Sequence, residues 1–328
     1  MYIENLKFSL WCDFVQRDFL DGEFVELIDK KIINGATSNP AIFKSAILTS
    51  EAYANDIKLL KNRSPKEIYE ALAIKDIKKA AEKLLPLYEK SDDGFISIEV
   101  DPFLCDDSQA TIDEGVRLFK EIGMPNVMIK VPATKAGYTA MTSLISKGIN
   151  VNATLIFSTK QTKECLGAFK KGVEMFDGKV LPKAVISIFV SRFDRKLDEK
   201  LKSLDIEEGK VGIYNAINAY KIIEDYGLKN IRALFASTGV KGDKFPADYY
   251  IRELLLKNSV NTAPLSTINC FIASKKIDEE VLIDTKTELF FEKLEKNGID
   301  LDLVCDELMV EGLEAFKEAF KEILDALK

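Results

Sequence analysis

The chain has 328 residues, of which 47% are hydrophobic and 30% charged, so it can bury a large core, and its net charge of −7 argues against a broad nucleic-acid surface. It contains no histidine, which excludes Ser-His-Asp and Cys-His catalytic sites and leaves acid–base chemistry to carboxylates, lysine, tyrosine, hydroxyls or water. Five scattered cysteines without a CxxC pair, no 18-residue apolar run and no signal-peptide pattern predict a cytoplasmic protein with reduced thiols and without disulfides, a bound metal or a membrane span.

Short apolar segments alternate with longer amphipathic ones along most of the chain. Segments such as VMIKV and TLIFS are nearly continuous apolar runs, which are typical of parallel strands buried on both faces. The predicted strands are, in chain order, Leu6–Asp13, Asn34–Thr37, Phe95–Val100, Val127–Val131, Val151–Phe157, Ala184–Phe189, Ile231–Ala236 and Leu265–Thr267. Eight strands with intervening helices favour a closed (β/α)8 TIM barrel of the α/β class. A Rossmann fold is disfavoured, because no G-x-G-x-x-G follows an early strand.

Two helical additions account for the length beyond a simple barrel. Residues 50–90 form a Lys/Glu-rich helical insertion between the second and third strands, and helical patterns at 281–298 and 303–328 extend the C-terminus. The last pattern is amphipathic and can suit a membrane surface or a partner. Its polar face mixes acidic and basic residues, so we expect it to pack on the barrel. Ser108 and Ser158 are predicted helix N-caps and Gly123 a helix end. Since no linker or repeat appears, residues 1–328 are predicted to form a single domain.

Lys130 lies inside the apolar segment VMIKVPAT. A charged, unpaired lysine in a protein core is costly. If the residue faces a cleft, the same apolar surroundings favour the neutral amine, which can attack a carbonyl group. The alternative is a structural lysine that extends from an edge strand to solvent or pairs with a carboxylate.

Polar residues recur at the C-terminal ends of the predicted strands, where barrels of this type collect their reactive groups. In chain order they are Asp13, Thr37, Ser38, Asn39, Glu99, Lys130, Asn152, Thr154 and Ser187. Each has a structural alternative: Asp13 can cap a helix, Asn39 can form a turn with Pro40, and Thr154 can be a half-buried strand residue. Together they predict one polar cavity.

Two loops carry residue types that bind phosphate. The helix after the sixth strand opens near Arg192, and the loop after the seventh strand contains Ser237 and Lys241. Helix N-terminal amides combined with Arg or Lys bind anions, and (β/α)8 barrels often hold phosphate near their last loops. Arg192 can instead pair with Asp194 or Asp198 on the helix surface.

Six ordered motifs resemble those of transaldolases: GATSNPAIF (35–43), SIEVDP (97–102), MIKVPAT (128–134), INVNATLIFS (149–158), ISIFVSRFD (186–194) and ASTGVK (236–241). The resemblance covers about residues 9–274, and the helical additions resemble those of the full-length enzymes. It implies a reaction without cofactor or metal, in which Lys130 forms a Schiff base with a sugar phosphate. A dihydroxyacetone unit then passes from sedoheptulose 7-phosphate to glyceraldehyde 3-phosphate, giving erythrose 4-phosphate and fructose 6-phosphate in the pentose phosphate pathway.

The resemblance also implies a role for each site residue. Asp13 acts on the donor hydroxyl proton during cleavage, while Glu99 and Thr154, with a water, move protons during imine formation and hydrolysis. Substrate contacts are implied for Asn39, Asn152, Ser187, Phe189, Arg192, Ser237 and Lys241. Familiar members often carry arginine in the loop where Lys241 stands, and lysine lacks its bidentate geometry.

Two other functions stay open. One is an aldolase on the same scaffold that releases dihydroxyacetone to water. Similar aldolases tend to carry Gln at the position of Glu99 and Tyr at that of Phe189, so these two residues favour transfer. The other is a barrel that binds sugar phosphates without catalysis, which the presence of Lys130, Glu99 and Asp13 disfavours. The surface composition is compatible with a monomer or a homodimer.

Overall fold

The computed structural model describes residues 2–274, 280–281 and 286–328, and within these residues eight parallel strands form a closed barrel. The strands are hydrogen-bonded in chain order, and the last strand closes against the first. Their bounds are β1 Ser9–Cys12, β2 Gly35–Thr37, β3 Phe95–Glu99, β4 Val127–Pro132, β5 Asn150–Ile156, β6 Ala184–Phe189, β7 Ile231–Ala236 and β8 Val260–Ala263. The predicted (β/α)8 barrel is therefore confirmed.

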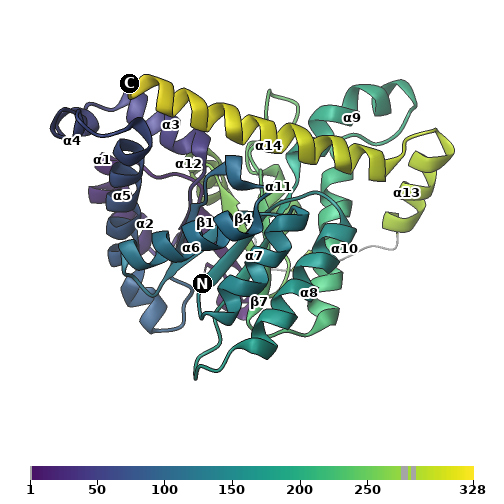
Figure 1. The fold of residues 1–328 in the computed structure, drawn as a ribbon. Helices are drawn as coiled ribbons and strands as arrows, with labels where there is room; N and C mark the ends of the chain where they lie inside the picture. Colours follow the sequence, from purple (N-terminus) through teal and green to yellow (C-terminus); the bar gives the residue numbers. More distant parts are fainter. Residues whose placement is uncertain (1, 275–279, 282–285) are drawn as a thin grey trace.

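Helices surround the barrel and extend it at the C-terminal end of the chain (Figure 1). The α-helices are α1 Arg17–Asp21, α2 Glu23–Asp29, α3 Pro40–Thr49, α4 Ala54–Leu60, α5 Pro65–Glu89, α6 Ser108–Ile122, α7 Lys135–Ser146, α8 Thr159–Met175, α9 Ser191–Ser203, α10 Val211–Tyr226, α11 Tyr249–Glu253, α12 Leu265–Ala273, α13 Lys286–Lys296 and α14 Leu301–Ala326. Short 3-10 helices are η1 Glu4–Leu6, η2 Glu51–Tyr53 and η3 Pro102–Leu104.

The predicted eighth strand was wrong. Residues 265–267 form the first turn of α12, and the eighth strand of the barrel is instead β8, Val260–Ala263. Two of the four β8 residues, Asn261 and Thr262, are polar, so the segment lacks the apolar run that marks several of the other strands. Pro264 then takes the N-cap position of α12 and begins the helix where the sequence pattern suggested a strand.

Local sequence signals explain how several helices begin and end. The Asn39 side chain accepts a hydrogen bond from the Ile42 amide at 3.0 Å and caps α3. Ser158 caps α8, and Gly123 ends α6 in a left-handed conformation with φ of 67°, both as predicted. Ser108 is not the cap of α6, because the side chain of the preceding Asp107 accepts the capping bond.

The helical additions lie where the sequence predicted them. The insertion between β2 and β3 ends in α5, which begins with a capping box of Ser64 and Glu67. At the C-terminus, α13 and α14 confirm the two predicted helical patterns, except that residues 282–285 of the first lie outside the described residues.

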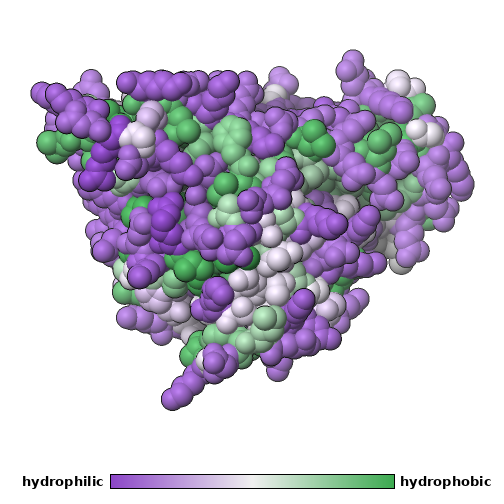
Figure 2. All heavy atoms as spheres, viewed as in Figure 1, coloured by the Kyte–Doolittle hydropathy of each residue, from purple (hydrophilic) through white to green (hydrophobic). Residues whose placement is uncertain are grey.

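The last helix, α14, packs on the barrel as expected. Figure 1 shows it running across one end of the molecule, from α13 and α9 toward α3. Its buried residues include Leu308, Gly312, Phe316 and Phe320. The face in Figure 2 is mainly hydrophilic, with hydrophobic residues in separate small groups. In the part of the chain that is described, no helix is long and apolar enough to cross a membrane.

Candidate active site

Lys130 is buried on β4 and lines a cavity at the carboxyl end of the barrel. The residue is only 5% exposed, and Nζ donates a hydrogen bond to the carbonyl oxygen of Ser38 at 3.1 Å. The ring centroid of Phe316, from α14, lies 6.0 Å from the same nitrogen. The lysine therefore faces a cleft rather than solvent, and the alternative of a snorkelling edge-strand lysine does not apply.

The cavity has a volume of about 160 Å³ and joins residues from most of the barrel strands. Its lining residues are Asp13, Thr37, Asn39, Ala41, Lys130, Ser187, Phe189, Arg192, Ala236, Ser237, Thr262 and Phe316. The predicted polar cavity is thus present, and seven of the predicted site residues line it. A larger hollow of about 750 Å³ lies at α13 and the start of α14, but it contains none of them.

Glu99, at the end of β3, is the register partner of Lys130 on β4. Its Oε2 lies 4.0 Å from Lys130 Nζ, which is an ion-pair distance but too long for a hydrogen bond. Both carboxylate oxygens are buried, and no described residue donates a hydrogen bond to them. Burial raises the pKa of Glu99 to about 8, against the opposing effect of the Lys130 charge. At neutral pH this carboxyl therefore holds a proton that it can donate.

Asp13 follows β1 and is held by a pair of threonines. The Thr37 hydroxyl donates to Asp13 Oδ1 at 2.6 Å, and Thr37 Oγ1 also lies 2.6 Å from Thr262 Oγ1. Burial raises the pKa of Asp13, while the Lys130 charge and the Thr37 hydrogen bond oppose that rise. A carboxyl held in this way suits proton exchange with a hydroxyl group in the cavity.

Neighbouring polar groups on β5 and β6 form a buried chain of hydrogen bonds. Ser187 donates to Asn152 Oδ1 at 2.6 Å, and Asn152 Nδ2 donates to Ser97 Oγ at 3.2 Å. Thr154 lies two residues further along β5, and its hydroxyl is buried without a hydrogen-bond partner among the described residues. Asn152 is the register partner of Lys130 on β5. This hydrogen-bonded chain therefore lies beside Lys130.

The expected phosphate end of the site is partly assembled. Arg192 lines the cavity, with its guanidinium carbon 5.4 Å from the Phe189 ring centroid, and burial lowers the pKa of this arginine. Ser237 lies beside it in a left-handed conformation with φ of 55°, and its Oγ is 3.0 Å from that of Ser191. Lys241 is exposed and does not line this cavity.

The two aspartates considered as partners of Arg192 are bonded elsewhere. Asp194 accepts hydrogen bonds from the Gly212 amide and the Tyr250 hydroxyl, and Asp198 accepts from the Gly209 amide. Arg192 lines the cavity and is not hydrogen-bonded to either of these aspartates.

Sequence reasoning missed three contributors to the site. Thr262 was missed because β8 was misplaced. Phe316 and Gly312 come from α14, whose docking position across the barrel end has no local sequence signal. A Cβ at position 312 would lie 2.9 Å from Leu155 Cδ2 and 3.2 Å from Arg192 Nη1, so glycine is what lets α14 approach the site so closely.

Within the described residues, no group of three or more His, Cys, Asp or Glu side chains is arranged to hold a metal ion. The side chains of the site offer an amine, two carboxyls, several hydroxyls and amides, and a guanidinium.

The sequence of the chain is similar to those of known enzymes. Residues 10–327 match the model of the transaldolase/fructose-6-phosphate aldolase family. The transaldolase of Campylobacter jejuni strain RM1221 is 49% identical, with 98% of this chain and 99% of the relative covered. The transaldolase of Helicobacter pylori strain ATCC 700392 / 26695 is 45% identical over the same shares. The chain belongs to the transaldolase/fructose-6-phosphate aldolase family.

Proposed function

We propose that the chain is a transaldolase, which transfers a dihydroxyacetone unit between sugar phosphates through a Schiff base on Lys130. The observation that carries the proposal is that one cavity contains both the buried amine of Lys130 and the half-buried guanidinium of Arg192. An amine in apolar surroundings forms an imine with a ketone, and a guanidinium binds phosphate. A ketose phosphate carries both of these groups.

In the first stage, Lys130 Nζ attacks the donor ketone to give a carbinolamine, which loses water to become an imine. Glu99 supplies the proton for the departing hydroxide, since its pKa of about 8 keeps it protonated at neutral pH. The Thr154 hydroxyl and a water complete this proton transfer in the proposal, because the hydroxyl is buried and has no other described partner.

In the second stage, Asp13 accepts the proton of a donor hydroxyl while the carbon–carbon bond breaks. An aldose phosphate leaves, and the dihydroxyacetone unit remains on Lys130 as an enamine. The acceptor aldehyde takes up that unit, and hydrolysis of the new imine frees the lysine. Thr37 holds Asp13 for both proton transfers through its 2.6 Å hydrogen bond.

Substrate binding divides between two sets of side chains. Asn39, Asn152 and Ser187 are proposed to hold the hydroxyls and carbonyl oxygen of the dihydroxyacetone unit. Arg192 and Ser237 are proposed to bind the phosphate. Lys241 is proposed as an outer phosphate contact only, because it is exposed and does not line the cavity. Sedoheptulose 7-phosphate and fructose 6-phosphate are the proposed donors, as in the pentose phosphate pathway.

Borohydride trapping tests the covalent step. With fructose 6-phosphate and reductant, mass spectrometry should find the dihydroxyacetone adduct on Lys130. The Lys130→Ala variant should carry no adduct, while Lys135→Ala, which changes an exposed lysine nearby, should trap normally. An unmodified Lys130, or equal labelling of Lys130→Ala, would mean that the barrel binds sugar phosphates without this chemistry.

A second assay separates transfer from aldol cleavage. Fructose 6-phosphate is supplied with and without erythrose 4-phosphate, and free dihydroxyacetone is measured. The cavity is lined by Phe189, which brings no hydroxyl to activate water for release of the unit. We therefore expect fast turnover only with the acceptor. Rapid release of dihydroxyacetone without it would identify an aldolase.

A further inference from the structure

Glu99 borders a second, smaller cavity on the outer side of the barrel wall. This cavity has a volume of about 10 Å³, and Glu99 lines it while Lys130 does not. It lies where β3 meets α5, α6 and α14, and Tyr69, Ala73 and Phe320 form part of its wall. A polar cavity needs about 10–15 Å³ to hold one water molecule, and this one has the lowest volume in that range.

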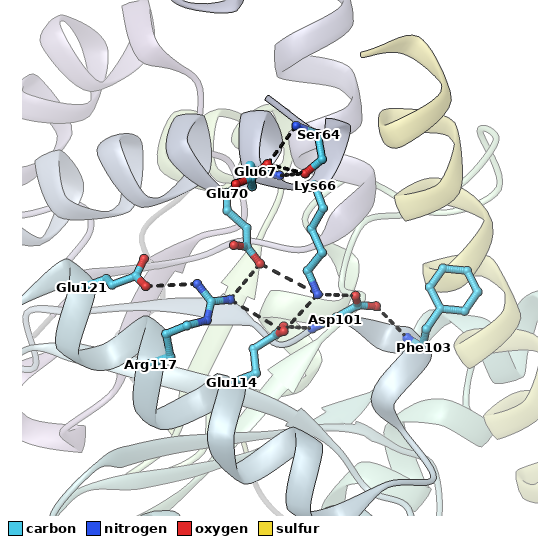
Figure 3. A network of polar contacts seen from close by, with 9 residues as sticks. All are labelled: Ser64, Lys66, Glu67, Glu70, Asp101, Phe103, Glu114, Arg117 and Glu121. Atoms are coloured by element: carbon cyan, nitrogen blue, oxygen red, sulfur yellow. Dashed lines mark hydrogen bonds and ion pairs between the residues drawn. The ribbon is translucent and has the colours of Figure 1, made fainter. Parts of the chain in front are cut away.

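The far side of this cavity is lined by charged groups that reach the surface. We call Lys66, Glu70, Asp101, Glu114 and Arg117 the α5–α6 charge cluster, and Figure 3 shows how their side chains converge. Its three carboxylates all line the cavity. Their side chains are 10–16% exposed and the two cations are 37% exposed, so the cluster links the cavity to solvent.

The contacts in the cluster hold its carboxylates in place. Lys66 Nζ lies 2.7 Å from Asp101 Oδ2 and 3.0 Å from Glu114 Oε2, and Arg117 Nη2 lies 2.8 Å from Glu70 Oε1. Glu114 Oε1 also accepts a hydrogen bond from the Asp101 amide at 2.7 Å. Helices α5 and α6 are thereby fixed against the end of β3, directly beside Glu99.

The buried carboxylate of Glu99 is independent evidence for a ligand in this cavity. Its residue is 8% exposed, and both carboxylate oxygens are buried without a hydrogen bond from any described residue. Nearly all buried polar atoms in proteins have a protein or water partner. Tyr69 lines the same small cavity as Glu99, so both residues border the space that a ligand would occupy.

We propose that the small cavity holds a water molecule between Glu99 and the α5–α6 charge cluster, and that protons exchanged at Glu99 enter and leave the protein by this route. The inference rests on the proposed function, in which Glu99 gives up a proton as the imine forms and has to regain one before the next turnover. Bound donor occupies the cavity at the Lys130 side, so a path on the opposite side lets Glu99 be reprotonated while substrate is present. This water is distinct from the one proposed beside Thr154, which does not line the small cavity.

The transfer is balanced. The Glu99 carboxyl passes its proton to the oxygen of the water, and the water passes another of its protons to a carboxylate of Glu70, Asp101 or Glu114. That carboxylate releases the proton to solvent, and the reverse sequence restores Glu99. Inside the barrel, Lys130 lowers and Asp13 raises the pKa of Glu99, and on the outer side Tyr69 and these three carboxylates line the small cavity with it.

Two substitutions interrupt the route without touching Glu99. Ala73→Val adds two methyl groups to a fully buried wall residue and fills the space for water. Tyr69→Phe removes the hydroxyl that, in this proposal, holds the water in place, but keeps the ring that packs edge-on against Phe43 and Phe320. The matched control is Ala80→Val, which makes the same change at another fully buried position of α5 that does not line the cavity.

We expect both cavity variants to lower kcat by roughly tenfold with little change in the KM for fructose 6-phosphate, because only proton transfer is slowed. Turnover should then rise with the concentration of a small buffer such as imidazole, which carries protons through the open mouth between half-reactions. The unmodified chain and Ala80→Val should show no such buffer dependence. A merely structural role for Tyr69 or Ala73 would not produce it.

Equal kcat in the cavity variants and the control, or a loss that does not respond to buffer, would overturn the inference. Thermal unfolding shows which variants fold, and either cavity variant alone decides the matter if the other is unstable. Borohydride trapping distinguishes a failure of the proposed function from a failure of the water route. Failure to trap an adduct on Lys130 in the unmodified chain would overturn the proposed function, whereas normal trapping with unaltered kinetics overturns only the water route.

Discussion

Two buried carboxylates next to cations, Asp76 and Glu99, differ in how they are hydrogen-bonded. Asp76, on α5, accepts from Arg17 Nε at 2.9 Å and from the Tyr53 hydroxyl at 2.8 Å. Glu99, on β3, lies 4.0 Å from Lys130 Nζ and accepts no hydrogen bond from a described residue. The first carboxylate is satisfied by the fold itself. The second has no such partner among the described residues, and in the proposal it exchanges protons during the reaction.

The pKa shifts of Asp76 and Glu99 are alike in direction, whereas their hydrogen bonds are not alike. Burial is the largest cause of a raised pKa at both Asp76 and Glu99, so a shifted pKa alone does not separate a structural ion pair from a catalytic one. The hydrogen bonds accepted by the two carboxylates do differ, and this difference agrees with the proposed catalytic role of Glu99. An unsatisfied buried carboxyl is costly to the fold, and proteins keep such groups mainly where function needs them.

The largest expected effect comes from Lys130→Met, which removes the amine and keeps a long apolar side chain. We expect transfer activity to fall by roughly 10⁴-fold, because the covalent nucleophile is lost. The free energy of unfolding should stay equal or increase, since Glu99 is largely protonated at neutral pH and needs no cation. Coupled assays and urea unfolding measure the two quantities, with Lys135→Met as the control. Retained transfer in Lys130→Met would exclude this lysine as the nucleophile.

Arg17→Met should lower stability and leave activity unchanged, which is the opposite of the result expected for Lys130→Met. It leaves Asp76 buried without its cation, and we expect a loss of about 3 kcal/mol in the free energy of unfolding. Activity per folded molecule should be unchanged, because the pair lies outside the cavity. The double variant Arg17→Met/Asp76→Asn should recover much of the stability, as a double-mutant cycle would show. A loss of kcat at full stability would place this pair in the catalytic machinery instead.

Glu99→Gln should lower kcat by about 100-fold with little change in donor KM, because it removes a proton carrier and keeps the shape. The rate that depends on protonated Glu99 falls as pH rises through about 8, and this limb of the profile should be absent in the variant. The control is Asp76→Asn, which makes the equivalent change at the other buried carboxylate. It should lower stability and leave the pH profile of the rate unchanged. A pure loss of donor affinity in Glu99→Gln would contradict the proton-transfer role.

Much of the site could be read from the sequence because polar residues stand out in apolar strands. Lys130, Glu99 and Asp13 were recognisable in this way, since each interrupts or ends a buried run. Thr262 was not, because β8 is itself half polar and offers no contrast. Phe316 depends on where a distant helix docks, which no local pattern specifies. The same limit applies to the pairing of Asp76, because many charged residues of an amphipathic helix look alike before the tertiary fold selects their partners.

Asp194 extends the comparison to a buried carboxyl that has hydrogen bonds but whose described partners are neutral. It accepts from the Gly212 amide at 3.1 Å and the Tyr250 hydroxyl at 2.9 Å, and burial raises its pKa to about 7. In the unfolded chain the same carboxyl loses its proton near the ordinary aspartate pKa of 3.8. Between about pH 4 and 7 the folded state therefore binds more protons, and this group makes stability decrease as pH rises.

Asp194→Asn removes this titration and keeps an acceptor for the Gly212 amide. We expect Tm to increase by about 3 °C at pH 8 and to change little at pH 4, because only the ionised carboxylate is destabilising. Calorimetry across this pH range measures the effect, with Glu199→Gln on the exposed side of the same helix as the control. If Tm falls with pH as steeply in Asp194→Asn as in the unmodified chain, the two hydrogen bonds are enough to stabilise the charge. Hydrogen bonding alone, without a cation, would then account for the whole contrast between Asp76 and Glu99.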